Sequence, residues 1–432
     1  MFTLTFHPNG ATGGSVPQPR SVPVGGMVWV SHYHENGLYR TWYLFTGWNT
    51  QSDGGGTSYQ IGDVFTVYAD SNLFAMWAVA PVMVWEMVSA GQVHSLAIRD
   101  DGSLWAWGSN TTGTIGLGKI STPIPTPTRV GTDNNWTSVS AGGVHSLAIR
   151  DDGSLWAWGW NIDGSTGLGT DTGNTLTPTR VGTENNWVSV SAGGVHSLAI
   201  RNDGSLWAWG ANFRGATGLG TSTGNTPVPT RVGTDYNWVS ISAGNWHSLA
   251  VRDDGSLWAW GYNWFGVTGL GTTTGNTLVP TRVGTDYNWV SVSAGTFHSL
   301  ALRDDESLWA WGGTRSGVGV STNTPTRVGT ANNWVSVSAG REHSLAIRDD
   351  GSLWVWGDNF QGQTGLGTWT GYTITPTRVG TANNWVSVSA GTYYSLAIRD
   401  DGLWAWGSNS AGQTGIGTAG GWLLNPTRVI MP

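Results

Sequence analysis

The stretch His145-Ser-Leu-Ala-Ile-Arg-Asp-Asp-Gly-Ser-Leu-Trp-Ala-Trp-Gly159 decides the fold, because it recurs with small changes seven times along the chain. Its copies begin at His94, His145, His196, His247, His298, His343 and Tyr394. Five of the six intervals between copies are 51 residues long, and the interval from His298 to His343 is 45. A fixed period near 50 residues indicates a solenoid, a propeller or an array.

Each repeat contains four strand candidates. Val188-Ser-Val-Ser-Ala192 and His196-Ser-Leu-Ala-Ile200 alternate apolar and small polar residues, which is the period of a β-strand. A turn with Gly follows, because Gly adopts the positive φ that tight hairpins need, and Leu206-Trp-Ala-Trp209 then alternates again. A short Pro-Thr-Arg-Val segment comes last, and its Pro suits an edge strand.

Four antiparallel strands per repeat make one propeller blade. The fold class predicted is therefore all-β, with a seven-bladed β-propeller over residues 82–432, since the elements that open and close the repeat each occur seven times. We expect the Trp-bearing face of one blade to pack on a Ser/Ala-bearing face of its neighbour.

Composition excludes several classes of protein. The 432 residues contain 66 Gly and no Cys, so a disulfide framework is excluded. The net charge is −7, and most Arg residues occupy two fixed positions of the repeat, so we expect no nucleic-acid partner. No apolar run is long enough to span a bilayer, and we expect no membrane insertion.

Residues 1–80 lack the repeat and predict a small β-rich domain with its own aromatic core. They resemble the Listeria–Bacteroides repeat, also called the internalin B-type repeat. The matching segments are Thr5-Phe6-x-x-Asn9-Gly10, Phe45-x-Gly47-Trp48-Asn49-Thr50, Asp53-Gly-Gly-Gly-Thr57 and Leu73-Phe-Ala-Met-Trp77. The resemblance implies a β-grasp-like module of prokaryotic surface and secreted proteins. His32, His34 and Glu35 form a polar segment there, and no third ligand is spaced to complete a metal site.

The repeats resemble those of the regulator of chromosome condensation family. The residues that carry the resemblance are Ala-Gly-x-x-His-Ser-Leu-Ala, Asp-Gly-Ser-Leu-Trp-Ala-Trp-Gly, Asn-x-x-Gly-x-Thr-Gly-Leu-Gly and Pro-x-x-Val. The family implies a seven-bladed propeller but no single activity, because its members include an exchange factor, a photoreceptor and an enzyme inhibitor. The photoreceptor carries Trp and then Arg after the Gly of its Gly-x-x-His pentads. That cluster is absent here, where the pairs read Asn245-Trp246, Thr296-Phe297 and Arg341-Glu342.

The variable positions of the repeat fall on one predicted face. Because neighbouring strands alternate in direction, the loops after strands one and three emerge together, and these loops vary. The loops after strands two and four emerge on the opposite face and are nearly constant. Free drift of exposed loops would also produce variation, but clustered aromatic and Arg residues are typical of binding hot spots.

This variable face supplies the candidate ligand-binding residues. They are Trp160, Phe213, Arg214, Trp246, Tyr262, Trp264, Phe265, Phe297, Arg341, Phe360 and Tyr393. Of the 30 Trp residues, 21 belong to the repeat and are expected in the core. Trp160, Trp246, Trp264, Trp369 and Trp422 remain outside both the repeat and the first domain.

The six repeated His residues are expected to make structural hydrogen bonds, because they lie in separate blades and cannot share a metal ion. The Asp-Asp-Gly segments predict turns, since a calcium site needs six or more oxygen ligands. Glu306 replaces the turn Gly in the fifth repeat, where we expect a locally altered edge that borders the binding face. We expect no catalytic residues, no metal and no cofactor.

The sequence therefore predicts a non-enzymatic extracellular or cell-surface protein of a prokaryote, which binds a protein or glycan through the variable propeller face. An alternative is a structural subunit of an extracellular filament or surface layer. In that case the first domain would self-associate through an exposed strand edge.

Overall fold

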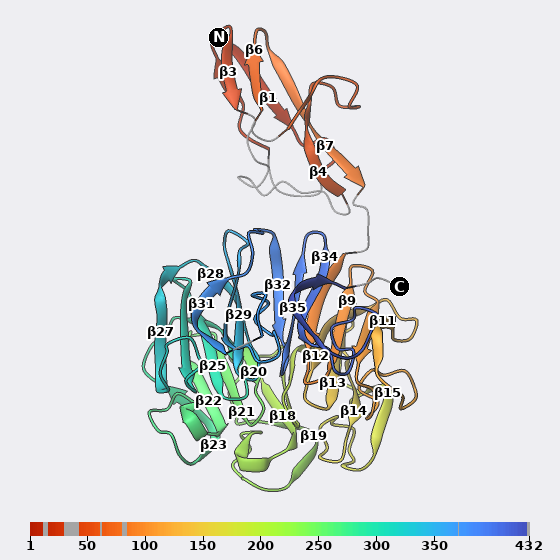
Figure 1. Cartoon of the computed structure of the whole chain (residues 1–432), viewed down its shortest axis with the longest axis vertical. Helices are drawn as coiled ribbons and strands as arrows, with labels where there is room; N and C mark the ends of the chain where they lie inside the picture. Colours follow the sequence, from red (N-terminus) through yellow and green to blue (C-terminus); the bar gives the residue numbers. More distant parts are fainter. Residues whose placement is uncertain (12–15, 30–42, 61–62, 80–83, 370, 430–432) are drawn as a thin grey trace. The chain divides into compact units, whose positions relative to one another are not determined.

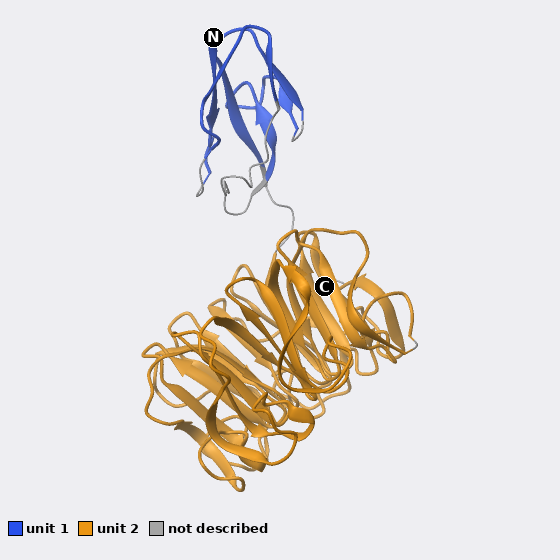
Figure 2. Ribbon diagram, turned by 90° about the vertical axis from the view of Figure 1, so that its left-hand side faces the viewer, with its two compact units in different colours: residues 1–83 blue, residues 84–432 orange. Residues whose placement is uncertain are grey.

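The computed structural model describes the chain except residues 12–15, 30–42, 61–62, 80–83, 370 and 430–432. The chain forms two compact units, Met1–Met83 and Val84–Pro432, which Figure 2 shows in different colours. His32, His34 and Glu35 lie outside the described residues. Within the described residues, no helix is long and apolar enough to cross a membrane.

The first unit contains a five-stranded sheet of order β2-β1-β7-β4-β5 and a separate pair, β3-β6. Its strands are β1 (Phe2–His7), β2 (Arg20–Val22), β3 (Gly26–Trp29), β4 (Tyr43–Asn49), β5 (Ser58–Tyr59), β6 (Val64–Val67) and β7 (Ser71–Val79). β1 runs parallel to β7, and the other pairs are antiparallel. Alternation along the strands buries Leu4, Phe6, Trp48 and Leu73 in one core.

The described part of the second unit folds into seven four-stranded antiparallel sheets, numbered here as sheets 1 to 7 in chain order (Figure 1). The first strands are β8 (Trp85–Ala90), β12 (Trp136–Ala141), β16 (Trp187–Ala192), β20 (Trp238–Ala243), β24 (Trp289–Ala294), β28 (Trp334–Ala339) and β32 (Trp385–Ala390). The second strands are β9 (His94–Arg99), β13 (His145–Arg150), β17 (His196–Arg201), β21 (His247–Arg252), β25 (His298–Arg303), β29 (His343–Arg348) and β33 (Tyr394–Arg399).

The outer half of each sheet follows in the same order. The third strands are β10 (Leu104–Gly108), β14 (Leu155–Trp160), β18 (Leu206–Ala211), β22 (Leu257–Tyr262), β26 (Ser307–Gly312), β30 (Leu353–Asp358) and β34 (Gly402–Ser408). The fourth strands are β11 (Ile124–Arg129), β15 (Asn174–Arg180), β19 (Asn225–Arg231), β23 (Asn276–Val283), β27 (Thr322–Asn332), β31 (Tyr372–Arg378) and β35 (Trp422–Arg428). The fourth strand is an edge in every sheet, as its Pro residues predict.

Neighbouring sheets pack face to face in a propeller-like arrangement. Trp136 and Trp158 of sheet 2 share a buried cluster with Leu96, Ile98 and Leu104 of sheet 1. The expectation of a Ser/Ala-bearing face was wrong, because Leu and Ile form most of that face. The Ser side chains bond between sheets instead, and the backbone N–H of the Ala that ends β12 donates to the Ser hydroxyl of β8 at 2.9 Å.

One backbone carbonyl links each pair of neighbouring sheets. The Thr114 carbonyl of sheet 1 accepts the Trp158 indole N–H at 2.8 Å and the Ser146 hydroxyl at 2.9 Å. The indole bond recurs in all seven sheets at 2.8–2.9 Å, and these seven Trp side chains are fully buried. The Trp that precedes each of them in the same strand stacks under the Arg of the second strand, with the guanidinium carbon 3.7–4.0 Å from the ring centroid. The repeated Trp residues are therefore structural.

The repeated His residues bond from sheet to sheet and form what we call the histidine ring. Its His–Ser pairs, with Nε2 2.8–3.1 Å from the hydroxyl, are His94–Ser146, His145–Ser197, His196–Ser248, His247–Ser299, His298–Ser344 and His343–Ser395. Tyr394 takes the seventh place: its hydroxyl donates to the His94 carbonyl at 2.6 Å and lies 2.9 Å from the Ser95 hydroxyl. The predicted structural hydrogen bond is confirmed.

Burial keeps the histidines of this ring neutral at neutral pH. All six imidazoles are buried, and the desolvation that results lowers their pKa from 6.5 to about 4 or about 3. The Ser146 hydroxyl donates its hydrogen to a carbonyl, so the His94 Nε2 must carry the hydrogen of that pair. Gly193 shows why a Gly lies three residues before each ring position: a Cβ there would lie 2.7 Å from the His196 ring.

Sheet 5 departs from its neighbours in two ways. Glu306 adopts a φ of 59°, close to the 74° of Gly255 at the same turn of sheet 4. The edge strand β27 is 11 residues long, and it pairs Asn332 with Ser307 beside that turn. The edge is thus altered as predicted. Glu306 follows the second strand and lies on the face opposite the candidate binding residues, whereas the loop between β26 and β27, which is shorter than its counterpart in sheet 4, lies on their face.

Candidate functional site

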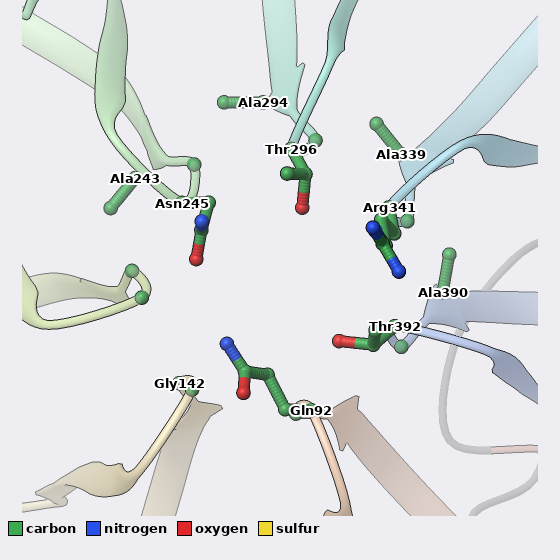
Figure 3. A pocket seen from close by; sticks show the side chains of 18 of the residues that line it. Gln92, Gly142, Ala243, Asn245, Ala294, Thr296, Ala339, Arg341, Ala390 and Thr392 are labelled. Atoms are coloured by element: carbon green, nitrogen blue, oxygen red, sulfur yellow. The ribbon is translucent and has the colours of Figure 1, made fainter. Parts of the chain in front are cut away.

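The loops after the first strands surround a central opening. Their second residues include Gln92, Asn245, Thr296, Arg341 and Thr392, whose side chains point into this opening (Figure 3). Backbone N–H groups of these loops donate to the Gly carbonyl of the next sheet, in six bonds of 2.9–3.4 Å. The opening therefore has a rigid backbone rim with variable side chains.

The loops after the third strands present two variable residues from a fixed frame. In sheet 4, Asn263 is buried, and its amide donates to the Thr272 carbonyl at 3.1 Å while its oxygen accepts the Thr268 N–H at 3.1 Å. The next two residues, Trp264 and Phe265, are 56% and 47% exposed. Asn, Gly and Thr recur at these frame positions in sheets 2, 3, 4, 6 and 7, while the two residues between Asn and Gly differ from sheet to sheet.

Side chains from these two sets of loops meet across sheets 3 and 4. Phe213 in the 3-10 turn η2 (Phe213–Gly215) contacts Trp246 edge to face, with centroids 5.7 Å apart. The Arg214 guanidinium lies 4.7 Å from the Phe213 centroid and 4.0 Å from that of Tyr262. Arg214 therefore joins the aromatic side chains of two neighbouring sheets.

The contacts continue toward sheet 5. Tyr262 stacks on Trp264 at 5.9 Å, and Trp264 in η3 (Trp264–Gly266) contacts Phe265 at 6.3 Å. Phe265 contacts Phe297, which lies in the first loop of sheet 5, at 5.6 Å.

Arg341 of sheet 6 extends the series toward sheet 7. Its guanidinium lies 5.6 Å from Phe297 and 5.0 Å from Tyr393. We call the connected set the aromatic arc; it consists of Phe213, Arg214, Trp246, Tyr262, Trp264, Phe265, Phe297, Arg341 and Tyr393. Nine of the eleven candidate residues thus form one continuous series of contacts.

Backbone strain coincides with this arc. Arg214 and Phe265 have φ values of 63° and 64°, in the left-handed region that disfavours side chains. They occupy the same position of the loop in neighbouring sheets. Such strain typically costs about 1–3 kcal/mol per residue and tends to cluster at functional sites.

Two candidates lie outside the arc. Trp160 ends β14 and is partly buried, and Phe360 is 53% exposed in the loop of sheet 6. Among the described residues, neither makes an aromatic or cation–π contact.

Two features were missed by the sequence-based prediction. Trp369, in the third loop of sheet 6, and Trp422, the first residue of β35 in sheet 7, stack at 5.9 Å and are both about half exposed. Their status as off-repeat Trp residues was the only signal in the sequence. Arg315 pairs with Glu342 and with Asp358, the latter at 3.2 Å. Arg315 is therefore held by two carboxylates of sheet 6 and links sheet 5 to that sheet.

The arc offers flat aromatic faces and guanidinium groups, which suit recognition more than chemistry. The six ring histidines are buried, and each is hydrogen-bonded to a Ser of the next sheet. Within the described residues, no group of three or more His, Asp or Glu side chains could hold a metal ion.

The chain is similar to known protein families and to individual proteins. A model of the RCC1-like domain matches residues 183–431, and a model of the regulator of chromosome condensation (RCC1) repeat matches residues 101–149 and 152–200. Ultraviolet-B receptor UVR8 of Arabidopsis thaliana is 31% identical over 241 residues, covering 54% of this chain and 54% of the receptor. Probable E3 ubiquitin-protein ligase HERC6 of Homo sapiens is 34% identical over 232 residues, covering 51% of this chain and 22% of the ligase.

The chain spans about half the length of the first of these relatives and less of the second. Among solved structures, yeast RCC1 (Prp20), crystallised with Kap60 bound, superposes with a TM-score of 0.68 and 25% identity over 79% of this chain and 85% of that chain. The all-β, propeller-like fold with repeated four-stranded sheets is therefore shared.

Proposed function

The chain belongs to the RCC1-like domain family, and on that premise we propose that it is a non-catalytic recognition protein whose aromatic arc binds a protein partner. The resemblance of the repeats that the sequence indicates is thereby confirmed. The observation that carries the proposal is the continuous series of arc contacts from Phe213 to Tyr393, on loops that differ between repeats whose interior is constant.

The residue types of the arc support a protein partner. Trp, Tyr and Arg dominate binding hot spots, and the arc places them side by side around partly exposed rings. A relative of the same fold, yeast RCC1 (Prp20), binds the protein Kap60. Ligase activity is not part of the proposal, since HERC6 matches over only 22% of its own length.

The finer architecture is also a proposal. We infer a closed seven-bladed propeller, which is supported by bonds from sheet 7 to sheet 1: the Trp107 indole donates to the Gln413 carbonyl at 2.9 Å, and the Ala90 N–H donates to the Ser389 hydroxyl at 2.9 Å. For the first unit we propose a β-grasp-like module. This is supported by its sheet of parallel and antiparallel strands and by the resemblance of residues 2–77 to the Listeria–Bacteroides repeat. The prokaryotic extracellular or cell-surface location rests on that resemblance alone and stays a prediction.

A binding screen tests the proposed function. The wild-type protein and the Trp246→Ala/Trp264→Ala variant are offered to arrayed surface proteins and glycans. The control is Tyr236→Ala/Tyr287→Ala, which removes two exposed aromatic side chains from the opposite face. We expect a protein ligand that the wild type and the control bind and the Trp variant does not; loss of every ligand in the control instead would contradict the proposal.

The alternative of a structural subunit has less support. The edge strands of the five-stranded sheet, β2 and β5, are three and two residues long, and β3 and β6 of the separate pair are four residues long each, so these short edges offer few groups for pairing with another chain. Light scattering across a range of concentrations separates the two functions. A constant monomer mass agrees with recognition, and ordered fibres or sheets would favour the structural subunit.

A further inference from the structure

The shortened repeat of sheet 5 creates a cavity beside the aromatic arc. We propose that this cavity is the anchor site for one aromatic side chain of the partner, an indole or a phenol. This inference rests on the proposed function and names the group that the arc recognises. Phe265, Phe297, Gly313, Arg315 and Glu342 are among the residues that line the cavity.

The cavity arises from the loss of the loop frame. The loops of sheets 3 and 4 hold a buried Asn that bonds across the loop, whereas sheet 5 has Thr314 at that position and reaches its fourth strand at Thr322. The position occupied by Tyr262 in sheet 4 is Gly313, so a side chain is missing at the same place. The missing side chain and the shorter loop together leave Phe265 and Phe297 with open space beside them.

The size of the cavity favours a single side chain. Its volume is about 210 Å³. Sites for drug-sized molecules are typically about 300–1,000 Å³, while a cavity of about 150 Å³ already accepts a benzene ring. An open groove lined by Trp264, Phe265, Thr274 and Asn323 adjoins the cavity and shares Phe265 and Ser321 with it. The partner chain can lie in this groove while one ring enters the cavity.

Charge favours a neutral occupant. Arg315 is paired with Glu342 and Asp358, and Arg341 lies beside Phe297, so two cations and two anions balance around the cavity. The Arg315 guanidinium forms its ion pair with one oxygen of the Glu342 carboxylate. A carboxylate has about four lone-pair sites, so Glu342 can also accept a hydrogen from an indole N–H or a phenol O–H. Edge-to-face contacts with Phe265 and Phe297 would hold the ring.

Fluorine NMR with 5-fluoroindole as the probe tests the inference on the full chain. We expect its signal to broaden on addition of the wild-type protein, and to broaden less in Gly313→Leu, which fills the cavity, and in Phe297→Ala, which removes a wall. Loss of one aromatic wall should weaken binding by about threefold to tenfold. Phe213→Ala removes an exposed ring of the arc that does not line the cavity, and it should bind the probe as the wild type does.

Two results would overturn the inference. One is that the wild-type protein does not broaden the signal; the other is that both cavity variants broaden it as much as the wild type does. Fluorobenzene, which lacks a polar hydrogen, should bind more weakly than 5-fluoroindole, and equal binding would remove the role of Glu342. A protein partner bound by Gly313→Leu but lost by Trp246→Ala/Trp264→Ala would leave the proposed function intact and reject the cavity alone.

Discussion

The histidine ring and the aromatic arc lie in the same repeats, one inside the protein and one on its surface. The ring repeats nearly the same side chains in seven sheets, because each His bonds to a Ser of the next sheet, and Tyr394 to the His94 carbonyl, in a space that is fully buried. The arc uses different residues at each equivalent loop position, yet its side chains still contact one another from sheet 3 to sheet 7. The difference teaches that the interior constrains every repeat, while the loops of one face can change without altering the sheets.

The largest effect is expected from acid, which should destabilise the protein by protonating the histidine ring. The folded-state pKa of each ring His is lowered to about 4 or about 3 by burial, so the unfolded state binds more protons below pH 6.5. The neutral histidines therefore make their full contribution to the free energy of unfolding above pH 6.5. This free energy falls as the pH decreases, by up to about 1.4 kcal/mol per pH unit for each histidine.

Chemical denaturation at pH 7.5, 6.5, 5.5 and 4.5 measures this loss. The carboxylates contribute little in that range; the pKa of Asp152, for example, is lowered below 3.8 by its hydrogen bonds with Ser154. A free energy of unfolding that stays constant down to pH 4.5 would contradict the assignment of six neutral buried imidazoles.

A single ring substitution should have the next largest effect. His247→Ala removes the bond to Ser299 and leaves a buried cavity, which together should cost about 3 kcal/mol. His247→Tyr copies Tyr394 and should cost less, because the Tyr394 hydroxyl donates to a backbone carbonyl of the next sheet. Denaturation at pH 7.5 compares the two variants, and equal loss in both would show that the hydrogen bond is unimportant.

A substitution in the aromatic arc should change stability little and weaken partner binding strongly. Trp264 is 56% exposed, so Trp264→Ala should change the free energy of unfolding by no more than about 1 kcal/mol. If Trp264 is a hot spot, its loss should weaken partner binding by about 2 kcal/mol, or roughly thirtyfold. Titration calorimetry with the identified partner measures the affinity, and a large loss of stability would mean that the arc supports the fold.

The smallest effect is expected at the strained turn of sheet 5. Glu306→Gly removes the cost of holding a side chain at a φ of 59°, and this gain exceeds the extra backbone entropy that Gly loses on folding. The substitution should therefore stabilise the protein by about 0.5–1 kcal/mol. Gly255→Ala is the matched control in sheet 4 and should destabilise, because its Cβ would lie 2.1 Å from the Tyr287 carbonyl oxygen. Destabilisation by Glu306→Gly would show that the Glu side chain makes a favourable contact.

Much of the fold could be predicted from the sequence, because period and alternation directly determine strands and their buried faces. The edge position of the Pro-Thr-Arg-Val strands and the hydrogen bond of the repeated His follow from residue type alone. The arc was predictable as a set of variable positions, since strand direction decides which loops share a face.

The contacts within the site could not be predicted from the sequence. The contacts of Arg214 with Phe213 and Tyr262 depend on a left-handed backbone, which residue type does not indicate. The cavity of sheet 5 depends on how a shortened loop closes, and the pairing of Arg315 with Asp358 depends on the same loop. Trp369 and Trp422 are far apart in the sequence, and only the side-by-side packing of sheets 6 and 7 brings them together.

Hydrogen exchange of the full chain with and without its bound partner tests the central claim most directly. We predict added protection in the loops around Phe213, Trp246, Phe265 and Phe297, with the ring strands protected equally in both states. Protection confined to the opposite face, around Tyr236 and Tyr287, would contradict the assignment of the aromatic arc as the binding surface.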